Sequence, residues 1–435
     1  MPAPTPSARM PRLLICIAVV TALADARAAE PSAADLPACL ARLRGGARAN
    51  GVSLADYDRL ARSIRWQAKT VDASRSQPEV LLTWKAYLDR VLTPARVARG
   101  QQIFTRWRTQ AEAVARRYGS DAEVITAIWG VESDFGTRMG TFPVLDAWAT
   151  LACLKPSDLR VNNFYGSMRL LAANRVPADR FTGSWSGAFG LTQFIPTSFE
   201  AYAADGDDDG AIDLYTSVPD AMASTARHLA ERTYWTRGVP AAIEVTMPPA
   251  LLQALTGGAT GETWIRAARP LATWAQQGVV RADGSSLLAG AIAPTTSWQA
   301  LLTEGARGRS FLLSSNFDAL TSYNKSTKYA IAVSLLARAV QAAAPSPAMS
   351  GPVSLPRPAA PAISASPPAS AEPIDPAAAV APVAPALSAA AAASASSTAA
   401  SSTAGDPPAP SAPPAPSSSA ASAAAVAASA ASAAN

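Results

Sequence analysis

The fold follows from one apolar stretch, Ala127-Ile128-Trp129-Gly130-Val131-Glu132-Ser133-Asp134-Phe135-Gly136, and from what lies on either side of it. The apolar run from Val124 to Val131 predicts a buried helix, and Gly136 marks the loop that follows. An acidic residue, Glu132, therefore stands at the end of a hydrophobic helix. Hydrophobic neighbours keep a carboxyl group protonated near neutral pH, so that it can donate to a leaving oxygen. The ordinary alternative is a helix-terminal glutamate that faces solvent.

Most enzymes that cleave glycosidic bonds place two carboxylates across the bond. Asp134 lies two residues after Glu132 and would face the opposite side if the helix continued. Asp146 is interpreted as the N-cap of the segment that follows it. Since no second carboxylate stands out, a mechanism with one acid, in which the substrate supplies the nucleophile, fits better than ordinary hydrolysis.

The sequence around this stretch predicts a mainly α (α+β) chain. Helical periodicity covers residues 29–120, which we expect to form a helical N-terminal domain, with a helix that starts at Pro94 after Thr93. Residues 121–237 are expected to form the catalytic core. Residues 238–309 predict a small β-containing insertion, because Ala242–Met247 alternates like a strand. Residues 310–342 return to the core and include a helix over Thr327–Val340.

The two ends of the chain have a different character. Arg9 and Arg12, an apolar run over 13–24 and small residues near Ala28 predict a signal peptide over residues 1–28. A lipid anchor on Cys16 is disfavoured, because that cysteine lies inside the apolar run. Residues 343–435 are rich in alanine, proline and serine and are expected to be a disordered tail. The sequence thus predicts an exported protein, located in the periplasm, soluble or associated with the cell wall.

Cysteine content and charge exclude several functions. Cys39 and Cys153 remain after the signal peptide, and the sequence leaves open whether they form a disulfide or two buried thiols. Two cysteines and a single histidine argue against a zinc site. The net charge is +5, and the arginines are scattered rather than clustered with aromatic residues, so we expect no nucleic-acid partner. Nothing predicts an organic cofactor.

Two further blocks accompany the stretch around Glu132. One is glycine-rich, Gly183-Ser184-Trp185-Ser186-Gly187-Ala188-Phe189-Gly190, and leads into Gln193. Small residues at this density let the backbone approach a ligand or a helix. The other block is Asn316–Ala330. In order and separation, the three blocks resemble the signature blocks of the membrane-bound lytic murein transglycosylase B family, and the resemblance extends over residues 36–340.

The resemblance implies a lysozyme-like catalytic core and a reaction on the glycan strands of peptidoglycan. It implies that Glu132 protonates the oxygen between N-acetylmuramic acid and N-acetylglucosamine and then, as a base, activates the muramyl 6-hydroxyl, which closes a 1,6-anhydro ring. The substrate's N-acetyl group is implied to stabilise the intermediate. The positions implied to contact the sugar are Ser184, Gln193, Tyr323, Asn324 and Tyr329. Hydroxyl, amide and phenol groups suit sugar recognition.

Two aromatic positions leave alternatives open. Tyr87 is either another residue of the cleft or an ordinary helix-packing tyrosine. His228, with Arg227, stands where the family often has Asn-Tyr, and we interpret it as a cleft or packing residue rather than a catalytic base.

The run from Asp205 to Asp213 has carboxylates at positions one, three and five, Asp205, Asp207 and Asp209, and glycine at position six. This is how a calcium loop of the EF-hand type begins. Thr216 stands where such a loop has glutamate, whereas the resemblance implies a longer loop that Asp220 would close. A structural Ca²⁺ ion is favoured over a solvated acidic turn.

Two other functions remain as alternatives, a muramidase that uses water on the same bond and a scaffold that binds peptidoglycan without catalysis. The intact stretch around Glu132 favours the enzyme. We expect a monomer, with other cell-wall proteins as peripheral partners.

Overall fold

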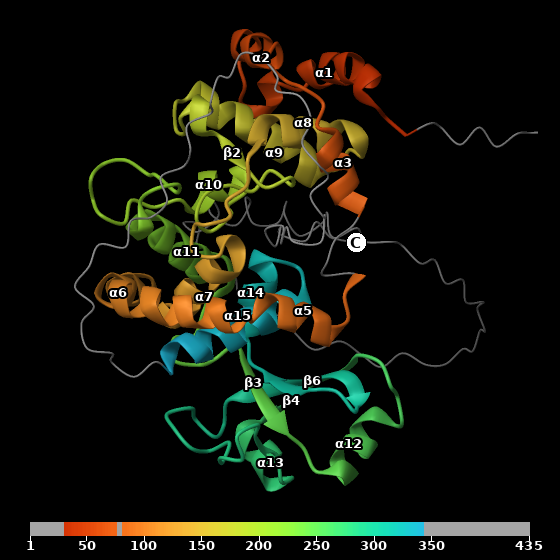
Figure 1. The fold of residues 1–435 in the computed structure, drawn as a ribbon, viewed down its shortest axis with the longest axis vertical. Coiled ribbons are helices and arrows are strands. Elements are labelled where there is room, and N and C mark those ends of the chain that lie inside the picture. The colour runs from red at the N-terminus through yellow and green to blue at the C-terminus, as the bar shows by residue number, and fades with distance from the viewer. Residues whose placement is uncertain (1–29, 76–80, 343–435) are drawn as a thin grey trace, which may run out of the picture. The chain divides into compact units, whose positions relative to one another are not determined.

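The helix that carries Glu132 lies at the centre of the fold (Figure 1). The computed structural model of the chain describes residues 30–75 and 81–342, and Figure 1 shows their arrangement. Helix α7 (Ala122–Ser133) is buried at every position except Glu123. It packs between the long helix α6 (Pro94–Tyr118) and the last helix, α15 (Thr327–Gln341). The buried helix predicted over Val124–Val131 is therefore confirmed.

Close contacts between these three helices depend on glycine. A Cβ atom on Gly130 of α7 would lie 3.0 Å from Cδ2 of Leu336 in α15, and one on Gly100 of α6 would lie 2.7 Å from Cγ1 of Val340 in α15. Helix α6 begins as predicted, since the Thr93 hydroxyl accepts a hydrogen bond from the Arg96 amide at 3.2 Å. Threonine at this cap followed by proline is the usual start of a helix.

The N-terminal helices pack on the same core. Helices α1 (Leu36–Arg44) and α3 (Ala68–Arg75) contact α8 (Val144–Leu154), and α2 (Leu54–Ala61) contacts α9 (Asp158–Ala172). Helix α5 (Trp84–Val91) contacts α15. One hydrophobic core runs through these helices from Leu36 to Val340.

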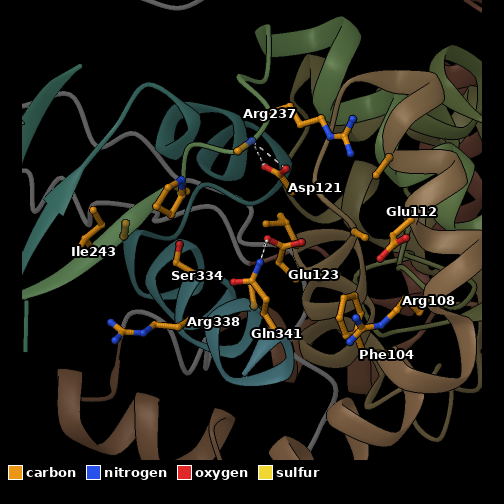
Figure 2. A pocket seen from close by; sticks show the side chains of 18 of the residues that line it. Phe104, Arg108, Glu112, Asp121, Glu123, Arg237, Ile243, Ser334, Arg338 and Gln341 are labelled. Carbon is orange, nitrogen blue, oxygen red and sulfur yellow. Dashed lines mark hydrogen bonds between the residues drawn. The ribbon is translucent and has the colours of Figure 1, made fainter. Parts of the chain in front are cut away.

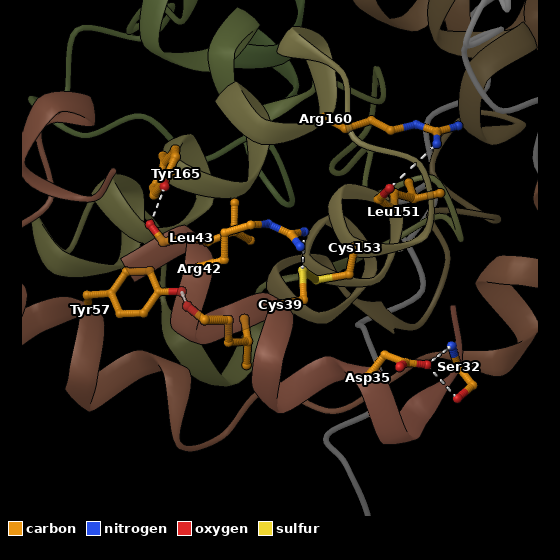
Figure 3. Close-up of a disulfide and its surroundings, with 11 residues drawn as sticks. Ser32, Asp35, Cys39, Arg42, Leu43, Tyr57, Leu151, Cys153, Arg160 and Tyr165 are labelled. Carbon is orange, nitrogen blue, oxygen red and sulfur yellow. Dashed lines mark hydrogen bonds between the residues drawn. A yellow bond between two sulfur atoms is a disulfide. The ribbon is translucent and has the colours of Figure 1, made fainter. Parts of the chain in front are cut away.

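A disulfide between Cys39 of α1 and Cys153 of α8 joins two parts of this core (Figure 3). The question that the sequence left open is thus resolved in favour of a bridge. The two cysteines are 114 residues apart. Because the bridge closes so long a loop, it lowers the conformational entropy of the unfolded chain and stabilises the folded protein by about 4 to 5 kcal/mol.

The predicted β-containing insertion forms a five-stranded antiparallel sheet with strand order β4-β6-β7-β3-β5. Its strands are β3 (Ala242–Thr246), β4 (Thr263–Pro270), β5 (Val280–Arg281), β6 (Ser297–Ala306) and β7 (Ser310–Leu313), with helices α12 (Pro249–Thr256) and α13 (Leu271–Gln276). A second, smaller core lies here around Trp274 and Trp298. The strand predicted over Ala242–Met247 is confirmed as β3.

The remaining elements are short or connect the blocks. They are η1 (Ala33–Asp35), η2 (Arg48–Asn50), η3 (Ala178–Arg180), the paired strands β1 (Phe142–Pro143) and β2 (Thr182–Gly183), and helices α10 (Pro196–Tyr202), α11 (Val218–Thr233) and α14 (Asn316–Tyr323). The mainly α fold with a small β insertion is confirmed. The domain boundaries at 120, 237 and 309 stay predictions.

The predicted signal peptide, residues 1–28, and the predicted tail, residues 343–435, lie outside the described residues. Among residues 30–75 and 81–342, no helix combines the length and the apolar character that crossing a membrane requires.

Candidate active site

Glu132 occupies the last turn of α7, and its side chain is only 1% exposed. The prediction that this glutamate is enclosed rather than solvent-facing is confirmed. Two features of this place disfavour a negative charge. Burial removes the carboxylate from water, and the carbonyl end of the helix carries a partial negative charge. Both favour the neutral carboxylic acid, the form that donates a proton.

Two tyrosines lie beside this carboxyl group, and a third lies beside one of them. Removal from water raises the pKa of the Tyr323 and Tyr329 phenols well above the ordinary value, and the negative charge of Glu132 raises it further. Tyr87, from α5, also contributes to the raised pKa of Tyr329, so the three phenols belong to one cluster. The structure thus brings together Glu132, Tyr87, Tyr323 and Tyr329, which come from four helices.

Ser184 and Gln193 lie in the glycine-rich loop and are buried. The Ser184 hydroxyl is 3.0 Å from the Ser186 hydroxyl and accepts a hydrogen bond from the Ala188 amide at 3.3 Å. Gln193 has a left-handed backbone, φ 51°, and its amide Nε2 donates to the Gly190 carbonyl at 2.9 Å. Both side chains hold the shape of the loop, and their predicted contact with sugar stays a prediction.

The loop is tied to the helices on both of its sides. The hydroxyl of Ser133, next to Glu132, donates to the carbonyl of Leu191. The Tyr323 hydroxyl donates to the Thr192 carbonyl at 2.6 Å. Trp148 of α8 donates from Nε1 to the Gly187 carbonyl at 2.9 Å. The loop therefore forms a wall, held by hydrogen bonds, beside the Glu132 carboxyl group.

Asn324 closes the turn between α14 and α15. Its side chain is buried, and Oδ1 accepts a hydrogen bond from the Ser326 amide at 3.0 Å. This bond orients the start of the helix that carries Tyr329. Its predicted role in binding sugar stays a prediction.

His228 packs among aromatic rings. Its ring centroid lies 4.8 Å from that of Tyr323 and 4.6 Å from that of Tyr202, both edge-on. Burial, assisted by the positive charge of Arg232, lowers the pKa of His228 to about 3. Such a histidine is neutral at pH 7 and a weak base, in agreement with its interpretation as a packing residue.

The turn after Glu132 has an unusual backbone. Asp134 and Phe135 are both left-handed, with φ of 50° and 57°, a conformation that costs a residue other than glycine about 1 kcal/mol or more. The Asp134 carboxylate accepts hydrogen bonds from Nε of Arg96 at 3.2 Å and from Arg99 at 2.9 Å. These arginines of α6 stabilise the turn. Sequence reasoning missed them, because they lie more than 30 residues away and no local pattern links them to Asp134.

Neither carboxylate that was considered as a partner of Glu132 is placed as a nucleophile. Asp134 is engaged with the arginines of α6. Asp146 lies within α8, whose N-cap is Pro143, so its prediction as an N-cap is wrong. Its buried carboxylate instead accepts a hydrogen bond from Nε2 of Gln67 at 2.9 Å, and burial raises the pKa of Asp146.

The acidic loop brings three of its four predicted ligands together. Carboxylate oxygens of Asp205, Asp207 and Asp209 all lie within 4.8 Å of one another. Asp220 acts differently, because its two oxygens accept hydrogen bonds from the amides of Gly206 at 2.7 Å and Asp213 at 2.8 Å. Asp220 therefore joins both ends of the loop to the start of α11.

Known proteins share this fold. A family model described as Transglycosylase SLT domain matches residues 35–338. Membrane-bound lytic murein transglycosylase B of Escherichia coli (strain K12) is 31% identical over 266 residues, which are 59% of this chain and 67% of that protein.

Two solved proteins of Pseudomonas aeruginosa are similar in structure. SltB3 in complex with NAG-NAM-pentapeptide has a TM-score of 0.63 and 34% identity, covering 71% of this chain and 80% of that one. SltB3 is also solved in complex with NAG-anhNAM-pentapeptide, with a TM-score of 0.62 and 35% identity over the same shares. The soluble lytic transglycosylase SltB1 has a TM-score of 0.57 and 26% identity, covering 70% and 98%.

The predicted lysozyme-like core and the family resemblance are both confirmed by these similarities. Since the family model covers residues 35–338 and the curated relative is 31% identical, the chain belongs to the transglycosylase SLT domain family.

Proposed function

We propose that this protein is a lytic transglycosylase that cleaves the glycan strands of peptidoglycan, with Glu132 as both acid and base. The observation that carries the proposal is the enclosed carboxyl group of Glu132, surrounded by tyrosines and a rigid loop. The Escherichia coli relative and SltB1 are lytic transglycosylases, and SltB3 is solved in complex with NAG-anhNAM-pentapeptide.

In the first step, the carboxylic acid of Glu132 donates its proton to the oxygen between N-acetylmuramic acid and N-acetylglucosamine, and the bond from C1 to that oxygen breaks. In the second step, the carboxylate removes the proton of the muramyl 6-hydroxyl, whose oxygen forms the new bond to C1. The proton returns to Glu132 and no water is consumed. The product ends in 1,6-anhydromuramic acid.

The engaged carboxylates support this mechanism over ordinary hydrolysis. A retaining or inverting hydrolase needs a second carboxylate as nucleophile or as the base for water. Asp134 and Asp146 are both committed to other groups. The 6-hydroxyl of the substrate can take the place of the missing group.

Product analysis separates this function from its alternatives. Purified protein is incubated with peptidoglycan sacculi, and the released muropeptides are analysed by mass spectrometry. We expect 1,6-anhydro ends. Reducing ends alone would indicate a muramidase, and binding without any release would indicate a scaffold.

We also propose that the acidic loop binds Ca²⁺ through Asp205, Asp207 and Asp209. Calcium prefers six to eight oxygen ligands from carboxylates, carbonyls and water, and this cluster supplies the carboxylates. When bound, the ion would hold the loop against the start of α11, to which Asp220 and Ser217 already connect it. Asp220 remains a proposed ligand that would have to exchange an amide for the ion.

A thermal unfolding series tests the calcium site. We expect added Ca²⁺ to raise the melting temperature and a chelator to lower it, and we expect Asp207→Asn to remove this response. Asp179→Asn, at an exposed aspartate outside the loop, serves as control. A melting temperature that is the same with Ca²⁺ and with chelator would contradict the site.

We infer that the protein is exported to the cell-wall compartment. The sequence of residues 1–28 supports export, and the bridge between Cys39 and Cys153 suits an oxidising environment. Fractionation of cells that produce the full chain tests this, and a cytoplasmic location would contradict it.

A further inference from the structure

We infer that a groove at the N-terminal end of α7, remote from Glu132, binds a short extended peptide that carries both amino and carboxylate groups. On the proposed function, on which this inference rests, that ligand is the peptide portion of a peptidoglycan strand. The groove lies between the helices and the start of the β-sheet (Figure 2).

The groove has the size of a ligand site and is separate from the active site. Its volume is about 740 Å³, within the range of roughly 300 to 1,000 Å³ that is usual for ligand pockets. It is lined by residues of α6, by the first turn of α7, by α15 and by β3. Glu123, which lines it, precedes Glu132 by nine residues of the same helix, so a rise of roughly 13 to 14 Å separates them along its axis.

Three carboxylates line the groove, those of Glu112, Asp121 and Glu123. Burial raises the pKa of Glu123, and the negative charges of Asp121 and Glu112 raise it further, while Arg237 opposes them. Asp121 is engaged with Nε1 of Trp235 at 2.9 Å and with the amide of Gly238 at 3.0 Å. Glu112 forms no ion pair within the described ranges. A cationic group of a ligand would relieve the repulsion between these carboxylates.

Five arginines, two of them from α6, line the same groove. They are Arg108, Arg116, Arg237, Arg281 and Arg338. Arg338 pairs with Asp283, and Arg281 donates to the carbonyls of Ser286 and Ala289. Arg116 and Arg237 make no ion pair with any carboxylate in the part of the chain that the structure covers. These two guanidinium groups are suited to a carboxylate of the ligand.

The main chain of β3 supplies the third element. Strand β5 pairs with β3 only at Val245 and Thr246, and the amide of Ala282 donates to the carbonyl of Glu244 at 3.0 Å. Backbone groups alternate between the two sides of a strand, so those of Ala242 point to the same side as those of Glu244, beyond the end of β5. Ala242 lines the groove. Its N–H and C=O can pair with an extended peptide, as in recognition at a sheet edge.

These three elements together match one class of ligand. The edge of β3 binds an extended main chain, the carboxylates bind an amino group, and the arginines bind a carboxylate. A plain anion would engage only the arginines, and an uncharged peptide would engage neither Glu112 nor the guanidinium groups of Arg116 and Arg237.

Calorimetric titration of the full chain tests the inference. The chain carries Glu132→Gln to prevent turnover, and the ligand is a synthetic pentapeptide with one lysine and a free carboxyl terminus. We expect saturable binding that weakens roughly tenfold when lysine is replaced by norleucine or when the terminus is amidated, since each change removes a charge-assisted contact.

Two variants locate the site. Glu112→Gln and Arg237→Gln should each weaken peptide binding by a similar factor, whereas Glu304→Gln, at an exposed glutamate of β6 outside the groove, should not. Turnover of sacculi by the chain that retains Glu132 is measured separately, so failure of the proposed function would show there and not in the titration. The inference is overturned if the peptide does not bind, if peptide-free glycan strands displace it, or if the groove variants bind it as well as the control.

Discussion

Helix α7 carries a glutamate at each end, and the two residues lie in opposite environments. Glu132, in the last turn, is 1% exposed, and the carbonyl end of the helix opposes its negative charge. Glu123, in the first turn, is half-buried, and the N–H end of the helix favours its charge. It accepts a hydrogen bond from Gln341 at 3.0 Å. The difference teaches that enclosure and helix position, rather than residue type, decide which glutamate can serve as the acid.

The largest expected difference between the two ends of α7 is in catalytic activity, and it is tested by removing each carboxylate in turn. Glu132→Gln preserves shape but cannot donate or accept the proton, so we expect turnover of sacculi to fall roughly 10²- to 10⁴-fold. Glu123→Gln, the matched variant at the other end of the helix, should retain nearly the wild-type rate at saturating substrate, since Glu123 transfers no proton. Both are measured by release of soluble muropeptides, with circular dichroism as a check of folding. Equal rates for the two variants would remove Glu132 from its assigned role.

The second test concerns the stability of the turn that follows Glu132. Asp134→Ala leaves Arg96, which is buried, without its carboxylate, and we expect a loss of about 3 kcal/mol in the free energy of unfolding. Asp134→Asn keeps a residue that tolerates the left-handed backbone and should lose less. Urea denaturation measures both. If both variants are as stable as the unaltered chain, the ion pair does not hold this turn.

The third test concerns the pH dependence of stability that arises from His228, which packs on Tyr323 near Glu132. The pKa of His228 is about 3 in the folded protein, below the ordinary value of 6.5. The unfolded chain therefore takes up the proton first, and stability is lost as pH falls from 6.5 toward 3. At pH 5 we expect this loss to be about 2 kcal/mol relative to pH 8.

His228→Phe should remove that part of the slope. Urea denaturation at pH 5 and pH 8 measures it for both proteins. An unchanged difference between the two pH values in the variant would show that His228 is not the buried neutral group.

At the other end of α7, Glu123 gives a pH dependence of stability that is opposite in sign to that of His228 and smaller. Burial raises the pKa of Glu123, so its folded form holds a proton more tightly than the unfolded chain does. Stability from this group is present below the ordinary pKa and is lost as pH rises through the raised value. Glu123→Gln removes the charge, and we expect a gain of less than about 1 kcal/mol at pH 8. A measurable loss of stability there would contradict this sign.

Local patterns explain which features could be predicted from the sequence. The apolar run before Glu132 predicts α7, Thr93 and Pro94 predict the start of α6, and the alternation over Ala242–Met247 predicts β3. In each case the signal lies within a few neighbouring residues, where helix and strand periods are expressed. The place of Glu132 could be predicted for the same reason.

Contacts between distant residues explain what could not be predicted. The pairing of Cys39 with Cys153 and the binding of Asp134 by Arg96 join segments that no pattern connects. Asp146 was misassigned as a cap because its real partner, Gln67, is 79 residues away. The groove at Glu123 likewise exists only where α6, α7, α15 and β3 meet.

One measurement tests the central claim, that Glu132 directs the 6-hydroxyl of the substrate rather than water, most directly. Sacculi are digested in water enriched in ¹⁸O, and the muropeptides are weighed by mass spectrometry. The account predicts products about 20 mass units lighter than the form that hydrolysis in this water would give, with no ¹⁸O in the muramyl end, since the new C1–O bond is made within the sugar. Incorporation of one ¹⁸O atom at each cleaved end would contradict it and establish hydrolysis.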